Sequence, residues 1–191
     1  MNMRIISGSY KGKKLFLPDA TITRPLRDYV KESLFNLLTH SKLINFNLVN
    51  SNIIDMFSGS GSFGIECLSR GATKVTFVEK EKKTFSILNK NIQNLSLEQK
   101  CTLLNKDILN FNFRKFLEPS VDLVFLDPPF QFDFLNELLN LLKKNSDKLT
   151  NSLVIIHVEN KNIFKFDNYL NILIKKKYGR SIIIFGKIKS I

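Results

Sequence analysis

The chain has 191 residues, 43% of them hydrophobic, and its 29 lysines and arginines outnumber its 17 aspartates and glutamates, giving a formal net charge of +12. This length suits one domain with a small extension; no apolar run indicates a membrane span or a signal peptide, so we expect a cytoplasmic protein. The positive excess predicts a polyanionic partner, nucleic acid above all, because each neutralised phosphate strengthens binding. Lysines that merely solvate the surface are the alternative.

Residues 4–17 are predicted to form a small β-hairpin around a glycine-containing turn at residues 8–12. Lysines gather at this turn beside a tyrosine that we expect to be exposed, a combination that suits phosphate contact and base stacking. An ordinary polar turn is the alternative. The candidate RNA-binding residues here are Arg4, Tyr10, Lys11, Lys13 and Lys14.

A helix is predicted after Thr23-Arg24-Pro25, with Asp28 as its N-cap. Arg24 joins the candidate RNA-binding residues. The apolar stripe of this helix comprises Val30, Leu34, Leu37 and Leu38, with Phe35 at its border.

From residue 52 onward, short apolar strands alternate with helical patterns, which is typical of a mainly parallel sheet covered on both faces. The expected strands are Asn52–Phe57, Lys74–Glu79, Thr102–Lys106, Val121–Leu126 and Leu153–Val158, and the expected helices are Phe63–Ser69, Lys82–Leu95 and Phe134–Leu142. The last apolar segments, Tyr169–Lys177 and Ser181–Lys187, are joined by only three residues, so they must pair antiparallel. The sequence therefore predicts an α/β fold closed by a C-terminal hairpin.

The stretch Ile53–Gly64 reads as a strand, a glycine turn and a helix N-terminus, an arrangement that holds a polar or anionic ligand on backbone N–H groups. Gly59, Gly61 and Gly64 fit the G-x-G-x-x-G spacing of dinucleotide sites, but this match alone is weak. The ligand must be identified from the rest of the chain.

Four successive predicted strands each end at a carboxylate, namely Asp55, Glu79, Asp107 and Asp127. Ligands of open α/β sheets bind beyond the carboxyl ends of the strands, so these acids should line one site. Asp55 could face an ammonium group, Glu79 could accept both hydroxyls of a ribose, and Asp107 could accept from an adenine amino group while Ile108 packs on the ring. Taken singly, each acid could equally be a solvated loop residue or a helix cap.

Asp127-Pro128-Pro129-Phe130 is the most discriminating motif. Two prolines directly after a strand form a stiff turn that fixes a carboxylate, a carbonyl and an aromatic ring relative to one another. Such a turn can hold an exocyclic amine on two acceptors while the ring stacks on the base, so that catalysis is largely positioning. A mere loop-terminating turn is the alternative.

Other candidate reactive residues have no such pattern around them. Cys67 and Cys101 lie far apart without metal-ligand spacing, which predicts buried, reduced thiols and no metal site. His40 and His157 have no sequence partner that suggests base or metal work, so we expect them at a helix cap or in the core. The serines of the glycine turn lack a histidine–acid arrangement, which argues against a nucleophilic serine.

The glycine turn and the Asp-Pro-Pro-Phe motif together resemble class I (Rossmann-like) S-adenosylmethionine-dependent amino-methyltransferases, with a seven-stranded, mainly parallel sheet. More closely, the chain is similar to the bacterial RsmD family, the 16S ribosomal RNA (guanine(966)-N2)-methyltransferases. The residues that carry this resemblance are Arg4–Gly8, Thr23–Pro25, Leu34–Asn36, Asp55–Gly61, Leu68–Ala72, Leu126–Phe130 and Lys177–Gly179. Leu26 and Ser58 depart from the family pattern, where threonine and alanine are usual.

The resemblance implies methyl transfer from S-adenosylmethionine, without a metal, to a guanine N2 amine of 16S ribosomal RNA, either free or in a small-subunit assembly particle. It implies a methyltransferase domain at 46–191, an RNA-contacting extension at 1–45, and a monomer. The implied cofactor-binding residues are Asp55, Phe57, Gly59, Gly61, Gly64, Glu79, Lys80, Asp107 and Ile108, and the implied catalytic residues are Asp127, Pro128, Pro129 and Phe130. Alternatives are a DNA adenine-N6 methyltransferase, a non-catalytic RNA-binding module and a nicotinamide dehydrogenase.

Overall fold

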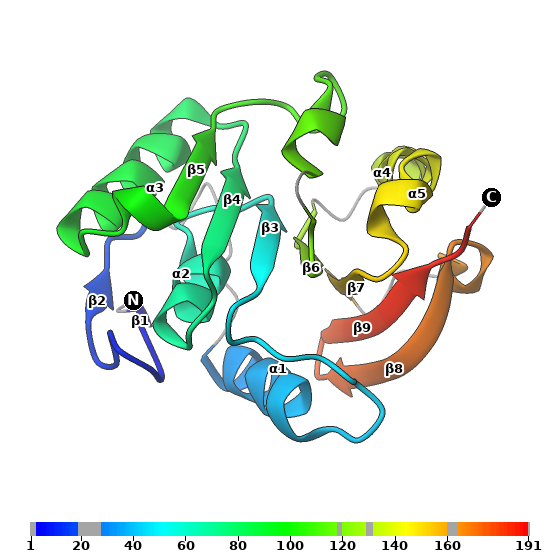
Figure 1. The fold of residues 1–191 in the computed structure, drawn as a ribbon, viewed down its shortest axis with the longest axis horizontal. Helices are drawn as coiled ribbons and strands as arrows, with labels where there is room; N and C mark the ends of the chain where they lie inside the picture. Colours follow the sequence, from blue (N-terminus) through cyan, green and yellow to red (C-terminus); the bar gives the residue numbers. More distant parts are fainter. Residues whose placement is uncertain (1–2, 19–27, 118–119, 129–131, 160–163, 191) are drawn as a thin grey trace.

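The protein is built around a seven-stranded sheet with strand order β5-β4-β3-β6-β7-β9-β8 (Figure 1). The computed structural model describes residues 3–18, 28–117, 120–128, 132–159 and 164–190. The strands are β3 (Asn52–Met56), β4 (Lys74–Val78), β5 (Cys101–Leu104), β6 (Leu123–Leu126), β7 (Leu153–Glu159), β8 (Leu170–Tyr178) and β9 (Ser181–Ile188). The first five are parallel, and β9 pairs antiparallel with both β7 and β8. The predicted fold class and its C-terminal hairpin are confirmed.

The strand order reverses direction at β3, and this reversal positions the site. From β3 the chain moves outward to β4 and β5, and then returns to place β6 on the other side of β3. Helices therefore leave the carboxyl ends of β3 and β6 toward opposite faces of the sheet. The resulting crevice at the strand ends is where ligands bind in open α/β sheets.

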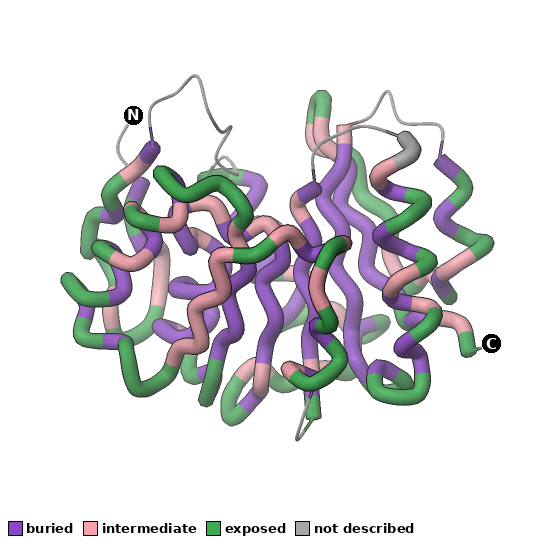
Figure 2. The backbone as a smooth tube through the Cα atoms, turned by 90° about the horizontal axis from the view of Figure 1, so that it is seen from above, coloured by how far each residue is buried: buried purple, intermediate pink, exposed green. Residues whose placement is uncertain are grey.

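Each face of the sheet is covered by its own set of helices and has its own apolar core. Helices α1 (Asp28–His40), α2 (Ser62–Ser69) and α3 (Lys82–Asn94) pack on one face, while α4 (Phe132–Lys144) and α5 (Ser146–Leu149) pack on the other. Because side chains alternate along a strand, Ile53 joins the first core and its neighbour Ile54 joins the second. The central strands form a continuous buried band in Figure 2. Short 3-10 helices at Glu98–Lys100, Phe113–Leu117 and Phe166–Asn168 complete the described elements.

The N-terminal hairpin lies along α2. Its strands, β1 (Met3–Arg4) and β2 (Lys14–Leu15), pair antiparallel as predicted. The carboxylate of Glu66, fully buried on α2, accepts the backbone N–H groups of Ile6 (2.8 Å) and Ser7 (2.9 Å). The turn is held by Ser69, whose carbonyl accepts Ser9 N–H at 2.8 Å. The hairpin is therefore bound to α2 along its length.

Two cations, fully buried Lys31 and partly buried Arg70, complete the network around Glu66. Lys31 of α1 is fully buried, and its Nζ donates to the Arg4 carbonyl (3.1 Å) and to Ser62 Oγ (3.2 Å) while lying 3.8 Å from Glu66. Burial lowers the pKa of Lys31, and the nearby Glu66 carboxylate opposes this shift. Arg70 donates to Glu66 at 2.8 Å, and its guanidinium lies 4.4 Å from the centre of the Phe35 ring.

Several details differ from the sequence expectations. Asp28 is the first residue of α1 rather than the residue before it. Phe35 is fully buried and stacks on Phe63, whereas Leu37 lies at the border, because the helix turns its Phe35 side toward α2. Tyr10 is half-buried against the core rather than exposed, because its backbone is held at Ser69 Oγ. Cys101 is only partly buried, and burial together with Glu98 raises the pKa of its thiol to about 12.

Candidate functional site

The turn after β3 brings backbone toward the crevice. Phe57, Gly59 and Gly61 all have positive φ angles, of 70°, 55° and 86°. A positive φ is sterically unfavourable for a residue with a side chain, and Phe57 adopts one nevertheless. Such conformations are concentrated at functional sites. A Cβ added at Gly59 would meet no atom within 4 Å, so the backbone there faces open space, whereas a Cβ at Gly61 would lie 2.5 Å from the Leu88 side chain. Gly59 can therefore border a ligand directly, and Gly61 allows α2 to approach α3.

Asp55 lies fully buried at the end of β3, beneath this turn. Its Oδ2 accepts the N–H of Gly64 at 3.1 Å, and its Oδ1 has no hydrogen-bond partner among the described residues. Burial raises the pKa of Asp55 well above its usual range, and the negative charges of Asp127 and Glu79 raise it further, against the Gly64 hydrogen bond. A buried acceptor without a partner is unfavourable in isolation, so Asp55 is suited to receive a donor or a cation from a ligand.

Gly64 acts on the site through Asp55 rather than by facing a ligand. A Cβ at Gly64 would lie 2.3 Å from the Phe77 ring, so its missing side chain allows α2 to pack closely on β4. This packing places the Gly64 N–H on Asp55. The third glycine of the motif therefore has a packing role, as in dinucleotide folds.

The carboxylates after β4 and β5 lie at the same end of the sheet as Asp55. Glu79 accepts the N–H groups of Gly59 (2.9 Å) and Glu81 (2.8 Å), and burial raises its pKa although these hydrogen bonds oppose the shift. Asp107 accepts from Lys80 Nζ at 2.6 Å, a contact that lowers its pKa. Each carboxylate oxygen can accept more than one hydrogen bond, so both acids keep capacity for ligand hydroxyl or amino groups. Ile108, beside Asp107, is buried in the second core.

At the end of β6, Asp127 pairs with His157, a residue that the sequence predicts at a helix cap or in the core. Its Oδ1 lies 2.8 Å from Nδ1 of His157 on β7. The imidazole is buried as expected, but its carboxylate partner was not anticipated. Only the strand register could have indicated this contact. Leu126 pairs with Ile156, so the next residues of the two strands, Asp127 and His157, stand side by side. Pro128 is buried at the start of the turn, while Pro129 and Phe130 lie outside the described residues.

An aromatic pair borders the crevice between the two halves of the sheet. Phe57 packs edge-on against Phe134 of α4, with ring centroids 5.5 Å apart. These rings connect the glycine turn on one side to the helix that follows Asp127 on the other. They give the crevice an apolar wall between its acidic groups.

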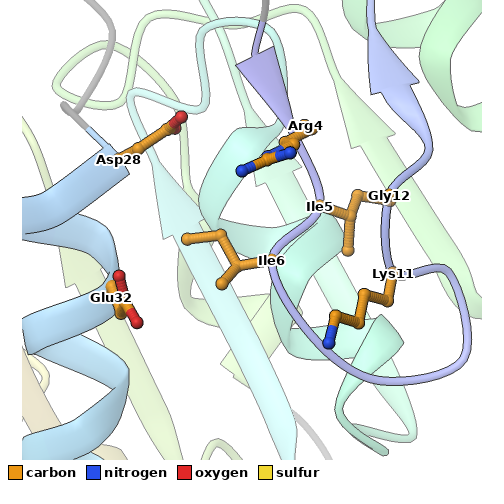
Figure 3. Close-up of a pocket in the computed structure, with 7 residues that line it drawn as sticks. All are labelled: Arg4, Ile5, Ile6, Lys11, Gly12, Asp28 and Glu32. Carbon is orange, nitrogen blue, oxygen red and sulfur yellow. The ribbon is translucent and has the colours of Figure 1, made fainter.

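Four of the six predicted RNA-binding residues are exposed on the hairpin, while Tyr10 is half-buried. Arg4, Lys11, Lys13 and Lys14 are exposed, whereas Arg24 lies outside the described residues. Arg4 and Lys11 line a pocket whose opposite wall carries Asp28 and Glu32 of α1 (Figure 3). In this pocket a phosphate could contact the basic side chains of Arg4 and Lys11, and a hydrogen-bond donor could contact the carboxylates of Asp28 and Glu32.

The described residues contain no group of three or more histidine, cysteine, aspartate or glutamate side chains able to hold a metal ion. In the same part of the chain, no helix combines the length and apolar character needed to cross a membrane.

Comparison with known proteins gives one consistent family. Residues 3–187 match the model of the family described as Conserved hypothetical protein 95. Ribosomal RNA small subunit methyltransferase D of Haemophilus influenzae is 38% identical over 158 residues, which cover 82% of this chain and 79% of that protein. The Escherichia coli protein of the same name is 34% identical over 163 residues, covering 84% and 76% respectively.

Solved structures agree with this match. The Escherichia coli methyltransferase yhhF aligns over 100% of both chains with a TM-score of 0.77 and 28% sequence identity. The fold is thus the Rossmann-like fold of class I methyltransferases. By family model, relatives and fold, this chain belongs to the RsmD family of methyltransferases.

Proposed function

We propose that the protein transfers a methyl group from S-adenosylmethionine to the exocyclic N2 amine of a guanine in 16S ribosomal RNA. Relatives named ribosomal RNA small subunit methyltransferase D support ribosomal RNA as the substrate. The observation that carries the proposal is the series of carboxylates Asp55, Glu79, Asp107 and Asp127, which stand at the carboxyl ends of the neighbouring strands β3, β4, β5 and β6.

The residues after β3, β4 and β5 fit S-adenosylmethionine. Oδ1 of Asp55, which has no partner among the described residues, can accept from its ammonium group, and the open side of Gly59 leaves room for the amino-acid part to lie against the backbone. We assign Glu79 to the ribose hydroxyls. We assign Asp107, whose carboxylate accepts from Lys80 Nζ, to the adenine amino group. When bound, this compound supplies an electrophilic methyl group on a sulfonium.

Asp127 is the residue we assign to the target amine. Its carboxylate can accept one N–H of the amine, and the Pro128 carbonyl can accept the other, which directs the nitrogen lone pair toward the methyl donor. Methyl transfer would break the bond between the methyl carbon and the sulfonium sulfur, leaving a neutral thioether, and the Asp127 carboxylate would accept the proton that the methylated nitrogen then loses. The chain's contribution is then mainly positioning and electrostatic complementarity.

The exposed lysines of the hairpin are assigned to the RNA backbone. Contacts of this kind fix the position of a nucleic acid without reading its sequence. Residues 1–45 thereby form the RNA-contacting extension of a methyltransferase domain at 46–191. We further propose that the protein acts as a cytoplasmic monomer on free 16S RNA or on a small-subunit assembly particle.

The test is to incubate the protein with labelled S-adenosylmethionine and unmodified 16S RNA, assembled small subunits, or adenine-rich duplex DNA, and to map the methylated nucleotide. Asp127→Ala should bind the donor normally and lose at least ~100-fold in turnover. Asp167→Ala is the matched control, because Asp167 is an exposed acid before β8, at the opposite edge of the sheet. Methylation of DNA alone, or full activity of Asp127→Ala, would contradict the proposal.

A further inference from the structure

Among the described residues, the hydrogen-bond partner of the Asp127 carboxylate is a side chain, that of His157. Asp127 and His157 stand side by side after the paired residues Leu126 and Ile156. Oδ1 of Asp127 and Nδ1 of His157 are 2.8 Å apart, and the two side chains are only 22% and 10% exposed. A hydrogen bond at this distance between largely buried groups restricts the rotation of both.

We propose that His157 is a positioning residue: its Nδ1–H holds Oδ1 of Asp127, so that Oδ2 is left to accept the N–H of the target amine. This inference rests on the proposed function and adds a residue to it. The terminal torsion of an aspartate is otherwise broadly distributed, so an unheld carboxylate would present its oxygens in many directions. Reacting groups lose rate steeply when they leave the productive geometry.

The surroundings of His157 favour this arrangement. Burial of the imidazole lowers its pKa, but the hydrogen bond and charge of Asp127 and the charge of Glu159 outweigh it, so the pKa of His157 is raised. Asp127 belongs to the neighbouring β6 and Glu159 to the same strand, while the paired residue on β9 is the apolar Ile183. With Oδ1 as acceptor, Nδ1 carries a proton whether the ring is neutral or charged.

Two substitutions separate positioning from packing. His157→Leu keeps most of the volume but removes the donor, and should lower kcat by at least ~10-fold while the KM for RNA and the Kd for S-adenosylmethionine change by less than about twofold. His157→Asn places an amide donor near the position of Nδ1 and should restore most of the lost turnover. His40→Ala is the matched control, because His40 is the other histidine and is exposed at the end of α1.

Unchanged turnover in His157→Leu, or equal losses in the Leu and Asn variants, would overturn the positioning role. Wild-type protein that methylates no RNA would instead remove the proposed function, and the positioning role with it. The two failures are therefore distinguishable.

Proton NMR gives a readout that is independent of activity. The chain has two histidines, so His40→Ala assigns both imidazole C2–H resonances in the folded protein. Asp127→Asn should lower the pKa of His157, because the carboxylate partner of that imidazole is lost. If the pKa of His157 is the same in Asp127→Asn as in the wild type, the pair does not form in solution and the inference is overturned. This test remains valid if His157→Leu fails to fold.

Discussion

Two fully buried carboxylates, Glu66 on α2 and Asp55 on β3 beside it, differ in how many hydrogen-bond partners they have. Glu66, under the N-terminal hairpin, accepts two backbone N–H groups and the Arg70 guanidinium, and lies 3.8 Å from Lys31 Nζ. Asp55, under the glycine turn, accepts a single N–H and keeps one oxygen without a described partner. A buried charge with all its partners supports structure, whereas one lacking a partner is stable only if something else completes it. The first belongs to the scaffold and the second to the site.

The largest effect on stability should come from removing Glu66, the buried carboxylate that has several hydrogen-bond partners. Glu66→Ala leaves Lys31 and Arg70 without their shared carboxylate and orphans the N–H groups of the hairpin. We expect a loss of about 3–5 kcal/mol in the free energy of unfolding, measured by urea denaturation. Glu98→Ala, at an exposed acid of the 3-10 helix before β5, should change it by less than about 0.5 kcal/mol. If Glu66→Ala lowers the free energy of unfolding by less than about 1 kcal/mol, the network around Glu66 does not stabilise the fold.

Removing the charge of Asp55, which has one oxygen without a described partner, should instead increase the stability of the fold. Asp55→Asn keeps the shape and should weaken S-adenosylmethionine binding by about 10–100-fold, the value of a charge-assisted hydrogen bond. Because burial raises the pKa of Asp55 in the folded protein, ionisation destabilises the fold as pH rises above the unfolded pKa. The variant should therefore unfold at a higher temperature near pH 7. Calorimetric titration and thermal denaturation measure the two changes, and a loss of both stability and affinity would contradict the contrast.

The Asp127–His157 pair is intermediate, because its two partners satisfy each other at the edge of the crevice. The folded-state pKa of His157 is raised above 6.5, so its stabilising contribution is fully present below that pH and is lost as pH rises through the folded value. Thermal denaturation of wild type and His157→Asn across the neutral range should show a stability difference that shrinks as pH rises. A difference that is constant with pH would argue against the ion pair.

The smallest effects should come from the exposed lysines that Glu66 holds in place indirectly. Lys11→Ala and Lys13→Ala should each weaken RNA binding about two- to fivefold and reduce the salt dependence by about one released counterion. Filter binding at several salt concentrations measures both. Lys144→Ala, at the end of α4 on the other side of the sheet, is the matched control. Equal changes in all three variants would mean that the hairpin is not a preferred RNA contact.

The sheet could be predicted from sequence because its strands are short, apolar and separated by helical patterns. The expected Lys74–Glu79 and Leu153–Val158 each differ from the observed strand by one residue at one end. The gathering of carboxylates at one end of the sheet could be predicted as well, because parallel strands bring their carboxyl ends together regardless of register. Helix α5 was missed because four residues carry too little periodicity.

Contacts that depend on register or on packing between distant segments could not be predicted in this way. His157 meets Asp127 only because Leu126 pairs with Ile156, and a shift of one residue would turn the histidine to the other face. The sequence alone makes no prediction that Glu66 or Lys31 is buried. Their burial follows from the hairpin lying over α2, a feature that local patterns do not encode.

Helix α2 has a consequence for substrate choice. Its first turn follows the cofactor-side glycines, and its last residue, Ser69, holds the tip of the hairpin. An eight-residue helix is about 12 Å long and does not stretch, so the basic tip and the methyl-transfer site keep a constant spacing. An RNA that docks on the lysines can present only those nucleotides that its own fold places at that offset. We expect the shape of the RNA, more than the sequence around the target, to select the methylated base.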